Sequence, residues 1–275
     1  MLNAERIRPF AFAMNANELI NSIPQSFVLV VFRLAGMMLF APLFGSARVP
    51  RRVKGMLVLV LAMGVMGGMK EKVNLPDNTW QLAAAIGGEM MFGLAMGMIL
   101  SLVFIATQWA GEMIGQQMGL NLGSVFDPQF GGQGSVLGDM YFMLTLVVFL
   151  SVGGHRSMLE GVRDSFEKLP LLTVGIDRPL FDTLTGLLGG ATVLAVRLAA
   201  PMLVTMLIVD LVLGLIGKSM PQMNVMSAGL TLRSVVGMVI VIAGLALTSA
   251  VIRDSVKDSM RQAYAAWTTP SPATP

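Results

Sequence analysis

Five ionisable side chains lie within or at the margins of the apolar stretches of the sequence. They are Arg33, Glu89, Asp139, Arg197 and Asp210. A charged group in lipid is unfavourable unless it faces water or a partner. These residues could relay protons or ions, or they could form structural ion pairs between helices or with another chain. They are spread singly, without a clustered pair of acids, which favours structural pairing.

A second unusual segment is Ala110–Ser135, which is rich in glycine and contains neither lysine nor arginine. A phosphate-binding loop needs a lysine or a strand-to-helix setting, so Gly131–Gly134 is a weak signal for a nucleotide site. The Met, Leu and Phe residues of the segment argue against disorder. We expect a semi-polar, flexible connection between helices, which would suit a constriction that seals and can yield.

A third segment, Lys218–Arg233, has an uncharged interior between two basic ends. We expect Pro221 to end a helix here. The side-chain amides of Gln222 and Asn224 can then satisfy the freed backbone groups. The simplest interpretation is a turn between two helices.

The composition indicates a membrane protein built from helices. Of 275 residues, 55% are hydrophobic and only 13% are charged, and the mean hydropathy is +0.73. The chain has no cysteine and a single histidine, His155, which excludes disulfides, thiol nucleophiles and iron–sulfur clusters and leaves little for a histidine-based metal site or triad. The net charge of +3 is scattered, which does not favour nucleic acid as a partner. We therefore predict no catalytic, cofactor-binding or metal-binding residues.

Six apolar stretches are candidates for bilayer-crossing helices, but their lengths are uneven. They cover Pro24–Phe44, Gly55–Met69, Gln81–Gln108, Val136–Gly154, Thr183–Gly217 and Ser234–Ile252. The second is short for a span. The fifth would be about 52 Å long as one helix, against a hydrocarbon core of about 30 Å, and it contains Pro201. It is therefore either two shorter helices or one long helix that projects beyond the bilayer.

The sequence gives less information about the two ends of the chain and about its orientation in the membrane. Residues 1–23 lack a clean apolar core and a cleavage site, so we expect no cleavable signal peptide. Positive-inside counting favours both termini in the cytoplasm, but the basic segment Ala47–Lys54 opposes this and leaves the orientation open. We expect one helical domain over residues 1–255 and a polar, proline-rich tail over residues 256–275.

Several segments together resemble one known family, in matching order and spacing from about residue 24 to about residue 255. They are Arg33–Gly36, Ala41–Lys54, Ala110–Leu120 followed by Asp127-Pro128, Phe149–His155, Asp164–Pro170, Asp210–Leu215 and Pro221–Val225. This combination resembles the FliR family of flagellar biosynthesis membrane proteins, which belong to the export gate of the type III secretion system.

The resemblance implies an all-α membrane protein whose bent helical hairpins pack into a multi-subunit helical pore. The implied partners are the FliP and FliQ families, the FlhB and FlhA export proteins, and unfolded flagellar proteins in transit. The implied location is the bacterial inner membrane at the flagellar basal body. In this sequence the pore plug would comprise Gly115, Gln116, Gln117, Met118, Gly119, Leu120 and Asn121. The residues implied in the hairpins and in assembly are Pro42, Pro50, Arg51, Arg52, Lys54, Pro221, Gln222 and Asn224.

Two other functions remain open from the sequence. One is the related injectisome export gate of virulence systems, which shares the fold. The other is an ion- or proton-coupled secondary transporter that would use Glu89, Asp139 or Asp210.

Overall fold

Every regular element in the described part of the chain is an α-helix. The computed structural model describes residues 25–42, 49–67, 78–120, 135–169, 171–172, 178–220, 222 and 224–268. The helices are α2 (Gln25–Phe40), α3 (Arg51–Met66), α4 (Thr79–Gln117), α6 (Val136–Ser151), α7 (Gly154–Lys168), α8 (Arg178–Ser219) and α9 (Val225–Thr268). The prediction of an all-helical protein is confirmed for these residues.

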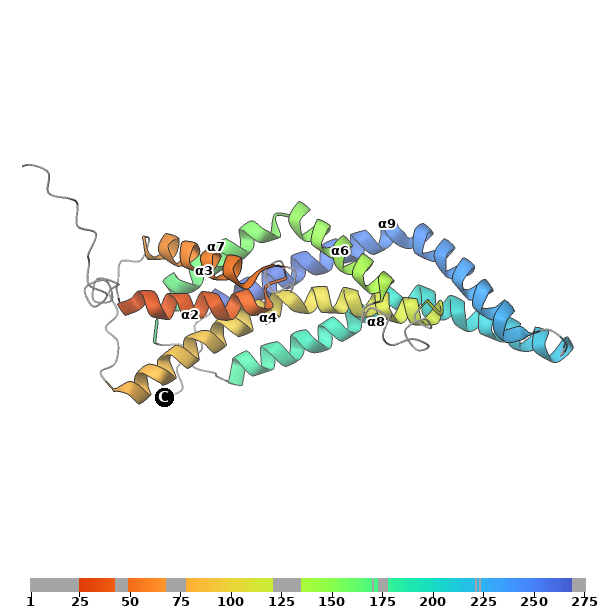
Figure 1. Ribbon diagram of the computed structural model, residues 1–275, viewed down its shortest axis with the longest axis horizontal. Helices are drawn as coiled ribbons and strands as arrows, with labels where there is room; N and C mark the ends of the chain where they lie inside the picture. Colours follow the sequence, from red (N-terminus) through yellow and green to blue (C-terminus); the bar gives the residue numbers. More distant parts are fainter. Residues whose placement is uncertain are drawn as a thin grey trace, which may run out of the picture.

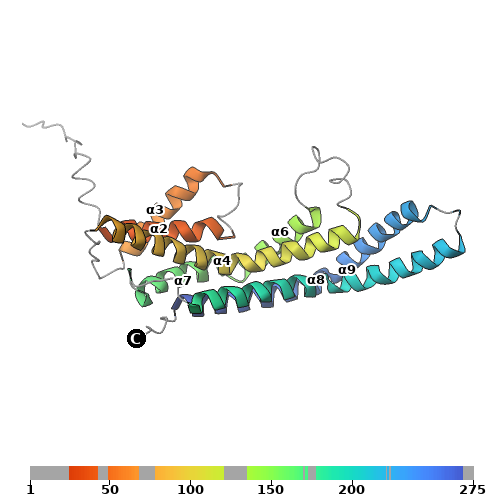
Figure 2. The ribbon, with the colours of Figure 1, turned by 90° about the horizontal axis from the view of Figure 1, so that it is seen from below.

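The molecule is elongated, and α4 runs along its centre (Figure 1). The helices α2, α6, α8 and α9 all contact α4. At the end of the molecule away from α2 and α3, the tip of the α8–α9 hairpin extends beyond the other helices in both views (Figure 2). By length and composition, three described helices could cross a membrane, or four if the bent α6–α7 pair is one span.

Glycines let α2 and α4 pack at backbone distance. A Cβ atom added at Gly93 would stand 1.9 Å from the Arg33 carbonyl oxygen, and one at Gly97 would stand 2.4 Å from that of Met37. On the facing helix, a Cβ at Gly36 would stand 2.3 Å from the Met90 carbonyl oxygen. Small residues at such spacing are the usual means of close helix association in membranes. The contact fixes the register of α2 on α4.

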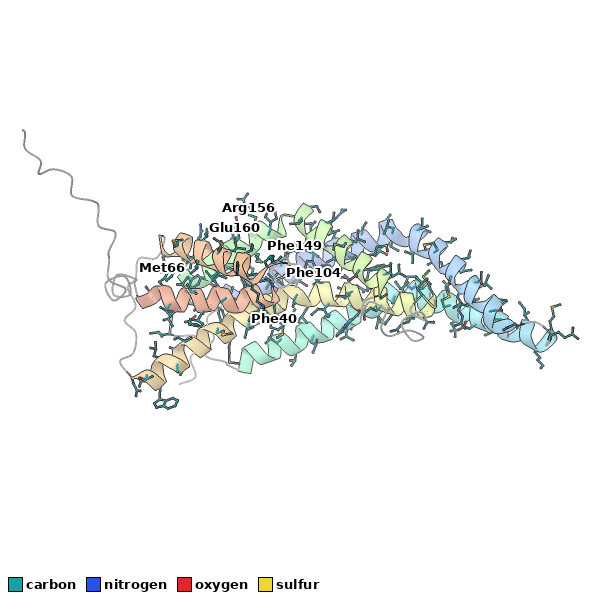
Figure 3. The ribbon with its side chains drawn as sticks, in the orientation of Figure 1. Phe40, Met66, Phe104, Phe149, Arg156 and Glu160 are labelled. Atoms are coloured by element: carbon teal, nitrogen blue, oxygen red, sulfur yellow. The ribbon has the colours of Figure 1, made fainter. Side chains whose placement is uncertain are left out.

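The α6–α7 pair is one apolar stretch that bends and then becomes charged. Ser135 caps α6 by accepting a hydrogen bond from the Gly138 N–H at 3.3 Å. The chain breaks at Gly153, whose φ of 80° is left-handed, and the two helices meet at 67°. Figure 3 labels Arg156 and Glu160 on the outer side of α7, where their side chains form an exposed ion pair. The six predicted stretches did not include α7.

The α8–α9 hairpin consists of two very long helices. Pro201 lies inside α8, which is nevertheless continuous over 42 residues, or about 63 Å. Of the two alternatives for this stretch, the long helix is correct. The Thr205 hydroxyl donates to the Pro201 carbonyl oxygen at 2.8 Å, one turn along the helix.

The boundary expected at residue 255 lies in the middle of a helix. Helix α9 continues to Thr268, and Val256 and Ala263 are buried within the core. Residues 256–268 therefore continue α9, and two of them contribute side chains to the core. The remainder of the expected tail, residues 269–275, lies outside the described residues.

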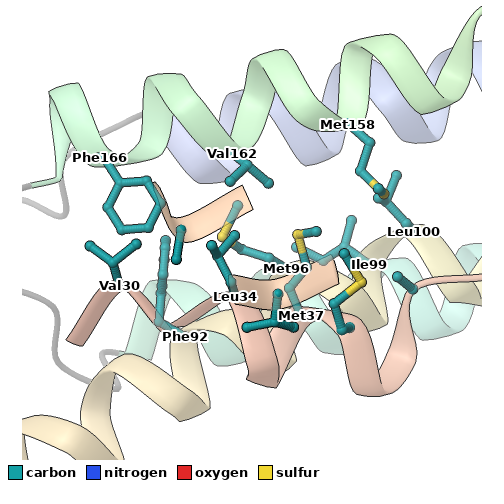
Figure 4. Close-up of a cluster of buried hydrophobic side chains, with 14 of the residues drawn as sticks. Val30, Leu34, Met37, Phe92, Met96, Ile99, Leu100, Met158, Val162 and Phe166 are labelled. Carbon is teal, nitrogen blue, oxygen red and sulfur yellow. The ribbon is translucent and has the colours of Figure 1, made fainter. Parts of the chain in front are cut away.

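The core divides into two main clusters along α4. One cluster joins α2, α3, the first half of α4 and α7, and Figure 4 shows its Met37, Met96, Ile99 and Val162 side chains turned toward one another. The other cluster joins the second half of α4 to α6, α8 and α9. In the latter, the Phe104 ring meets the edge of Phe149 with their centroids 5.5 Å apart.

Candidate functional site

The most completely buried polar site is an ion pair between α2 and α4. The Arg33 Nε atom donates to Glu89 Oε2 at 2.6 Å, and both side chains are about 1% exposed. A second guanidinium nitrogen of Arg33 donates to the Ser165 and Leu169 carbonyl oxygens at 3.4 and 3.2 Å. The network therefore joins α2, α4 and the end of α7.

Aromatic rings and a backbone amide complete this Arg33 network. The Arg33 guanidinium carbon lies 5.0 Å from the Phe92 ring centroid and 4.6 Å from that of Phe166. The other Glu89 oxygen accepts a hydrogen bond from the Leu172 N–H at 3.0 Å. Leu172 has a φ of 72°, which a non-glycine residue rarely adopts, so its hydrogen bond helps to fix a strained turn. The arrangement is suited to holding three segments together.

The other three ionisable candidates differ from the expectation of burial. Within this chain Asp139 and Arg197 are exposed, and Asp210 is partly exposed. The reason is that their helices present these faces outward, away from the two core clusters. Asp210 forms an ion pair with Arg233 of α9, with the nearest atoms 2.6 Å apart. The described structure therefore pairs Arg33 with Glu89 and Asp210 with Arg233, and it forms no chain of acids.

The residues implied as the pore plug lie at the C-terminal end of α4. Gly115, Gln116 and Gln117 are helical, so the expectation of a loop from Ala110 onward is wrong over Ala110–Gln117. Asn121 lies outside the described residues. The helix continues because no proline interrupts this part of the chain.

The end of α4 has a specific hydrogen-bonding geometry. Gly119 has a φ of 75°, and its N–H donates to the Gln116 carbonyl oxygen at 3.0 Å. The Leu120 N–H donates to the Gly115 carbonyl oxygen, also at 3.0 Å. This pair of bonds around a left-handed glycine is a Schellman motif, which satisfies carbonyls that the helix end would leave unpaired.

Met118 fixes this turn against the α8–α9 hairpin. It is fully buried, and its carbonyl oxygen accepts a hydrogen bond from the Ser234 hydroxyl at 3.0 Å. A Cβ atom at Gly237 of α9 would stand 2.4 Å from Met118 Cγ and 2.5 Å from Met202 Cε. Gln116 and Leu120, by contrast, are exposed. The turn thus has a buried side held by the hairpin and an uncharged side free for other contacts.

Some of the residues implied in hairpins and assembly lie around the start of α3. Pro42 is buried, and Pro50 precedes α3, whose first turn contains the exposed Arg51 and Arg52 and the half-buried Lys54.

The connection between α8 and α9 contains the remaining hairpin residues. Asn224 precedes α9, and its side-chain oxygen accepts a hydrogen bond from the Ser227 N–H at 3.3 Å. Gln222 is exposed in the turn, and Pro221 lies outside the described residues.

Sequence reasoning missed the aromatic and backbone partners of Arg33. Phe92 lies one helical turn after Glu89 in the sequence, so the i, i+3 spacing on one helix face was an available signal. The contacts from Ser165, Phe166 and Leu169 join residues more than 130 positions from Arg33. No local pattern gives such a contact.

Comparison with known proteins places the chain in a family of membrane export proteins. The family model described as "Bacterial export proteins, family 1" matches residues 25–259. The flagellar biosynthetic protein FliR of Bacillus subtilis (strain 168) is 28% identical over 244 residues, which cover 86% of this chain and 92% of that protein.

Two further relatives show the breadth of the family. FliR of Escherichia coli (strain K12) is 28% identical over 75% of this chain and 79% of its own length. The surface presentation of antigens protein SpaR of Shigella flexneri is also 28% identical, over 77% of this chain and 82% of its own length. The match of the family model to most of the chain, together with its long apolar helices, shows that this integral membrane protein belongs to family 1 of the bacterial export proteins.

Proposed function

We propose that the chain is a non-enzymatic pore and gate subunit of the flagellar type III protein export apparatus. The observation that carries this proposal is the exposed apolar surface of the α8–α9 hairpin. Only 22% of the most apolar window of α8 and 17% of that of α9 are buried within the chain, against 72% for α4. Each hairpin helix is also about twice as long as the hydrocarbon core is thick. Such helices need partner chains to cover the apolar surface that extends beyond the bilayer.

The proposed partners are membrane proteins of the FliP and FliQ families, with the FlhB and FlhA export proteins nearby. The proposed location is the inner membrane, at the base of the flagellum. Unfolded flagellar proteins would pass through the assembled pore. The similarity to SpaR keeps the injectisome gate as a second candidate.

A gene deletion separates these two systems. If the chain serves the flagellum, cells without it are non-motile and export no flagellar proteins, and a plasmid copy restores both. Cells that keep their flagella but stop secreting virulence effectors would assign the chain to the injectisome.

We further propose that the turn at the end of α4 contributes to closing the pore. The buried Met118 holds the turn in place, while Gln116 and Leu120 face away from the chain. A seal of uncharged, flexible side chains suits the passage of chains of any sequence, because a charged gate would bind some of them. The backbone freedom of Gly119 allows the turn to form.

Paired glycine substitutions test this role of the turn. In Gly237→Ala the new methyl group displaces Met118, whereas in Gly244→Ala on the same helix nothing lies within 4 Å of the new atom. We expect cells with the complete apparatus and Gly237→Ala to leak small ions, and cells with Gly244→Ala to remain tight. A Leu120→Ala variant, altered only on the exposed side, should leak as well. Normal membrane conductance in Gly237→Ala and Leu120→Ala would contradict the proposal.

A further inference from the structure

A groove of about 310 Å³ lies where α4, α8 and α9 meet. Ile99, Leu102 and Val103 of α4 line one apolar side, and α8 contributes Gly186 and Gly190, among other residues. The two glycines keep the groove open, because a Cβ atom at either would meet nothing within 4 Å. The volume is at the lower end of the range for small-molecule sites, about 300–1,000 Å³.

The α9 side of this groove is polar. Ser255, Asp258, Ser259 and Gln262 of α9 line it, each separated from the next by one helical turn or less. Hydroxyl, carboxylate and amide groups therefore face an apolar surface across a narrow space. An amphipathic ligand matches such a pair of surfaces.

Arg197 also lines the groove, and its charge has no counterpart among the described residues. It makes no ion pair or hydrogen bond there, although it lies within an otherwise apolar part of α8. Arginine in an apolar helix normally has an anionic or polar partner. Side chains on a helix lean toward its N-terminus, which directs Arg197 along the groove toward Gly190. An anion in the groove would supply such a partner for Arg197.

The polar side of the groove lies where the uncharged part of α9 ends. Residues 234–252 contain no charged side chain, whereas Arg253, Asp254, Lys257, Asp258 and Arg261 follow within nine residues. Such a change marks the boundary between hydrocarbon and headgroups. Helix α8 contacts α9 as the other arm of the hairpin, so the groove between them opens at this boundary.

We propose that the groove binds one zwitterionic phospholipid of the phosphatidylethanolamine type. Its phosphate lies against Arg197 and the hydroxyls of Ser255 and Ser259. Its ammonium group faces Asp258, whose other cationic neighbour is Arg261 of the same helix, 3.6 Å away and exposed. An acyl chain lies along the apolar side formed by α4 and over Gly190. The site does not depend on the proposed role of the chain in a pore.

Native mass spectrometry of the purified full chain tests this site, with phosphatidylethanolamine added to delipidated protein. Gly190→Leu fills the groove and should abolish the lipid-bound peak, and Arg197→Gln should weaken binding about tenfold, as expected for a lost charge-assisted hydrogen bond. The matched controls are Gly189→Leu, which also has open space but does not line the groove, and Arg253→Gln, another exposed cation. Both should bind as the unaltered chain does.

Three results would overturn the proposal. The first is equal lipid binding by Gly190→Leu, Arg197→Gln and their controls. The second is tighter binding of phosphatidylglycerol than of phosphatidylethanolamine, which would contradict the pairing of Asp258 with an ammonium group. The third is a cysteine at position 190 that crosslinks to a partner protein in the assembled complex, because the groove would then hold protein rather than lipid.

Discussion

Arg33 shows how a single residue can hold three segments of a membrane protein. Its charge is balanced by Glu89, its Nη1 atom donates to two backbone carbonyls, and its flat faces contact two aromatic rings. Arginine suits this role because its planar group can make several directed bonds while stacking on aromatic rings.

Removing one member of the pair tests its structural role. Glu89→Ala should destabilise the purified chain by about 3–5 kcal/mol, because it leaves the Arg33 charge buried without a counterion. The double variant Arg33→Met, Glu89→Leu should recover part of this loss. Thermal unfolding in detergent measures both effects.

The control for this experiment is Arg156→Ala. It removes an ion pair with Glu160 whose side chains are 81% and 52% exposed, and such surface pairs contribute about 0.3–0.5 kcal/mol. An effect of Glu89→Ala no larger than that of the control would contradict the role of the Arg33 network.

For single residues, the sequence predicted which ionisable side chains are unusual better than it predicted what surrounds them. Arg33 and Glu89 stand out because charges are rare in apolar helices, but nothing in the sequence pairs them with each other. Asp139 and Arg197 stand out in the same way, yet both are exposed in this chain. Periodicity shows that a residue lies in a helix; it does not show which face of that helix another helix covers.

Among the elements, α4 is the helix on which the others are assembled. α2 packs against the glycines of α4, and α6 contacts its middle through a hydrogen bond between the Thr145 and Thr107 hydroxyls at 2.9 Å. The C-terminal end of α4 packs against α8 and α9. The sequence indicated the extent of its apolar part. Its C-terminal end was missed, since Gly111 and Gly115 suggested a loop, whereas in the structure α4 remains helical through both.

Glycine substitutions on α4 test the contact between α4 and α2. Gly93→Ala should destabilise the chain by about 1–3 kcal/mol, because its methyl group would overlap the Arg33 backbone and force the helices apart. Gly87→Ala on the same helix has open space and should be neutral or slightly stabilising, since alanine favours helix more than glycine. Equal melting temperatures for the two variants would show that close packing at Gly93 contributes nothing.

The first turn of α3 is basic, and its charges can be tested separately. Arg51 and Arg52 are exposed at the positive end of the helix dipole, where cations do not stabilise a helix. Alanine at Arg51, Arg52 and Lys54 should therefore leave the stability of the chain unchanged while reducing the yield of assembled complex. Pull-down of partner proteins and thermal unfolding of the same preparation measure the two quantities. Normal complex yield would refute a role for this cluster in assembly.

At the scale of the whole molecule, much apolar surface is left uncovered by the chain itself. Its hairpin extends far beyond the core and exposes apolar residues along both arms, among them Leu207, Leu211, Leu215, Val239 and Ile242 (Figure 2). The uneven lengths of the apolar stretches already indicated that a row of ordinary spans does not fit. The proposed assembly rests on the resemblance to a family, because the sequence of one chain does not show which other chains cover its surfaces.

The central claim is that this chain is a subunit of a multi-protein export pore, and the mass of the purified complex tests it most directly. The chain would be co-expressed with the proposed partners of the FliP and FliQ families, purified from membranes and weighed by native mass spectrometry. The account predicts a large assembly that contains one copy of this chain together with several partner chains. A stable monomer or homodimer that leaves those partners unbound would contradict the account and would make the carboxylates of a transporter the next residues to study.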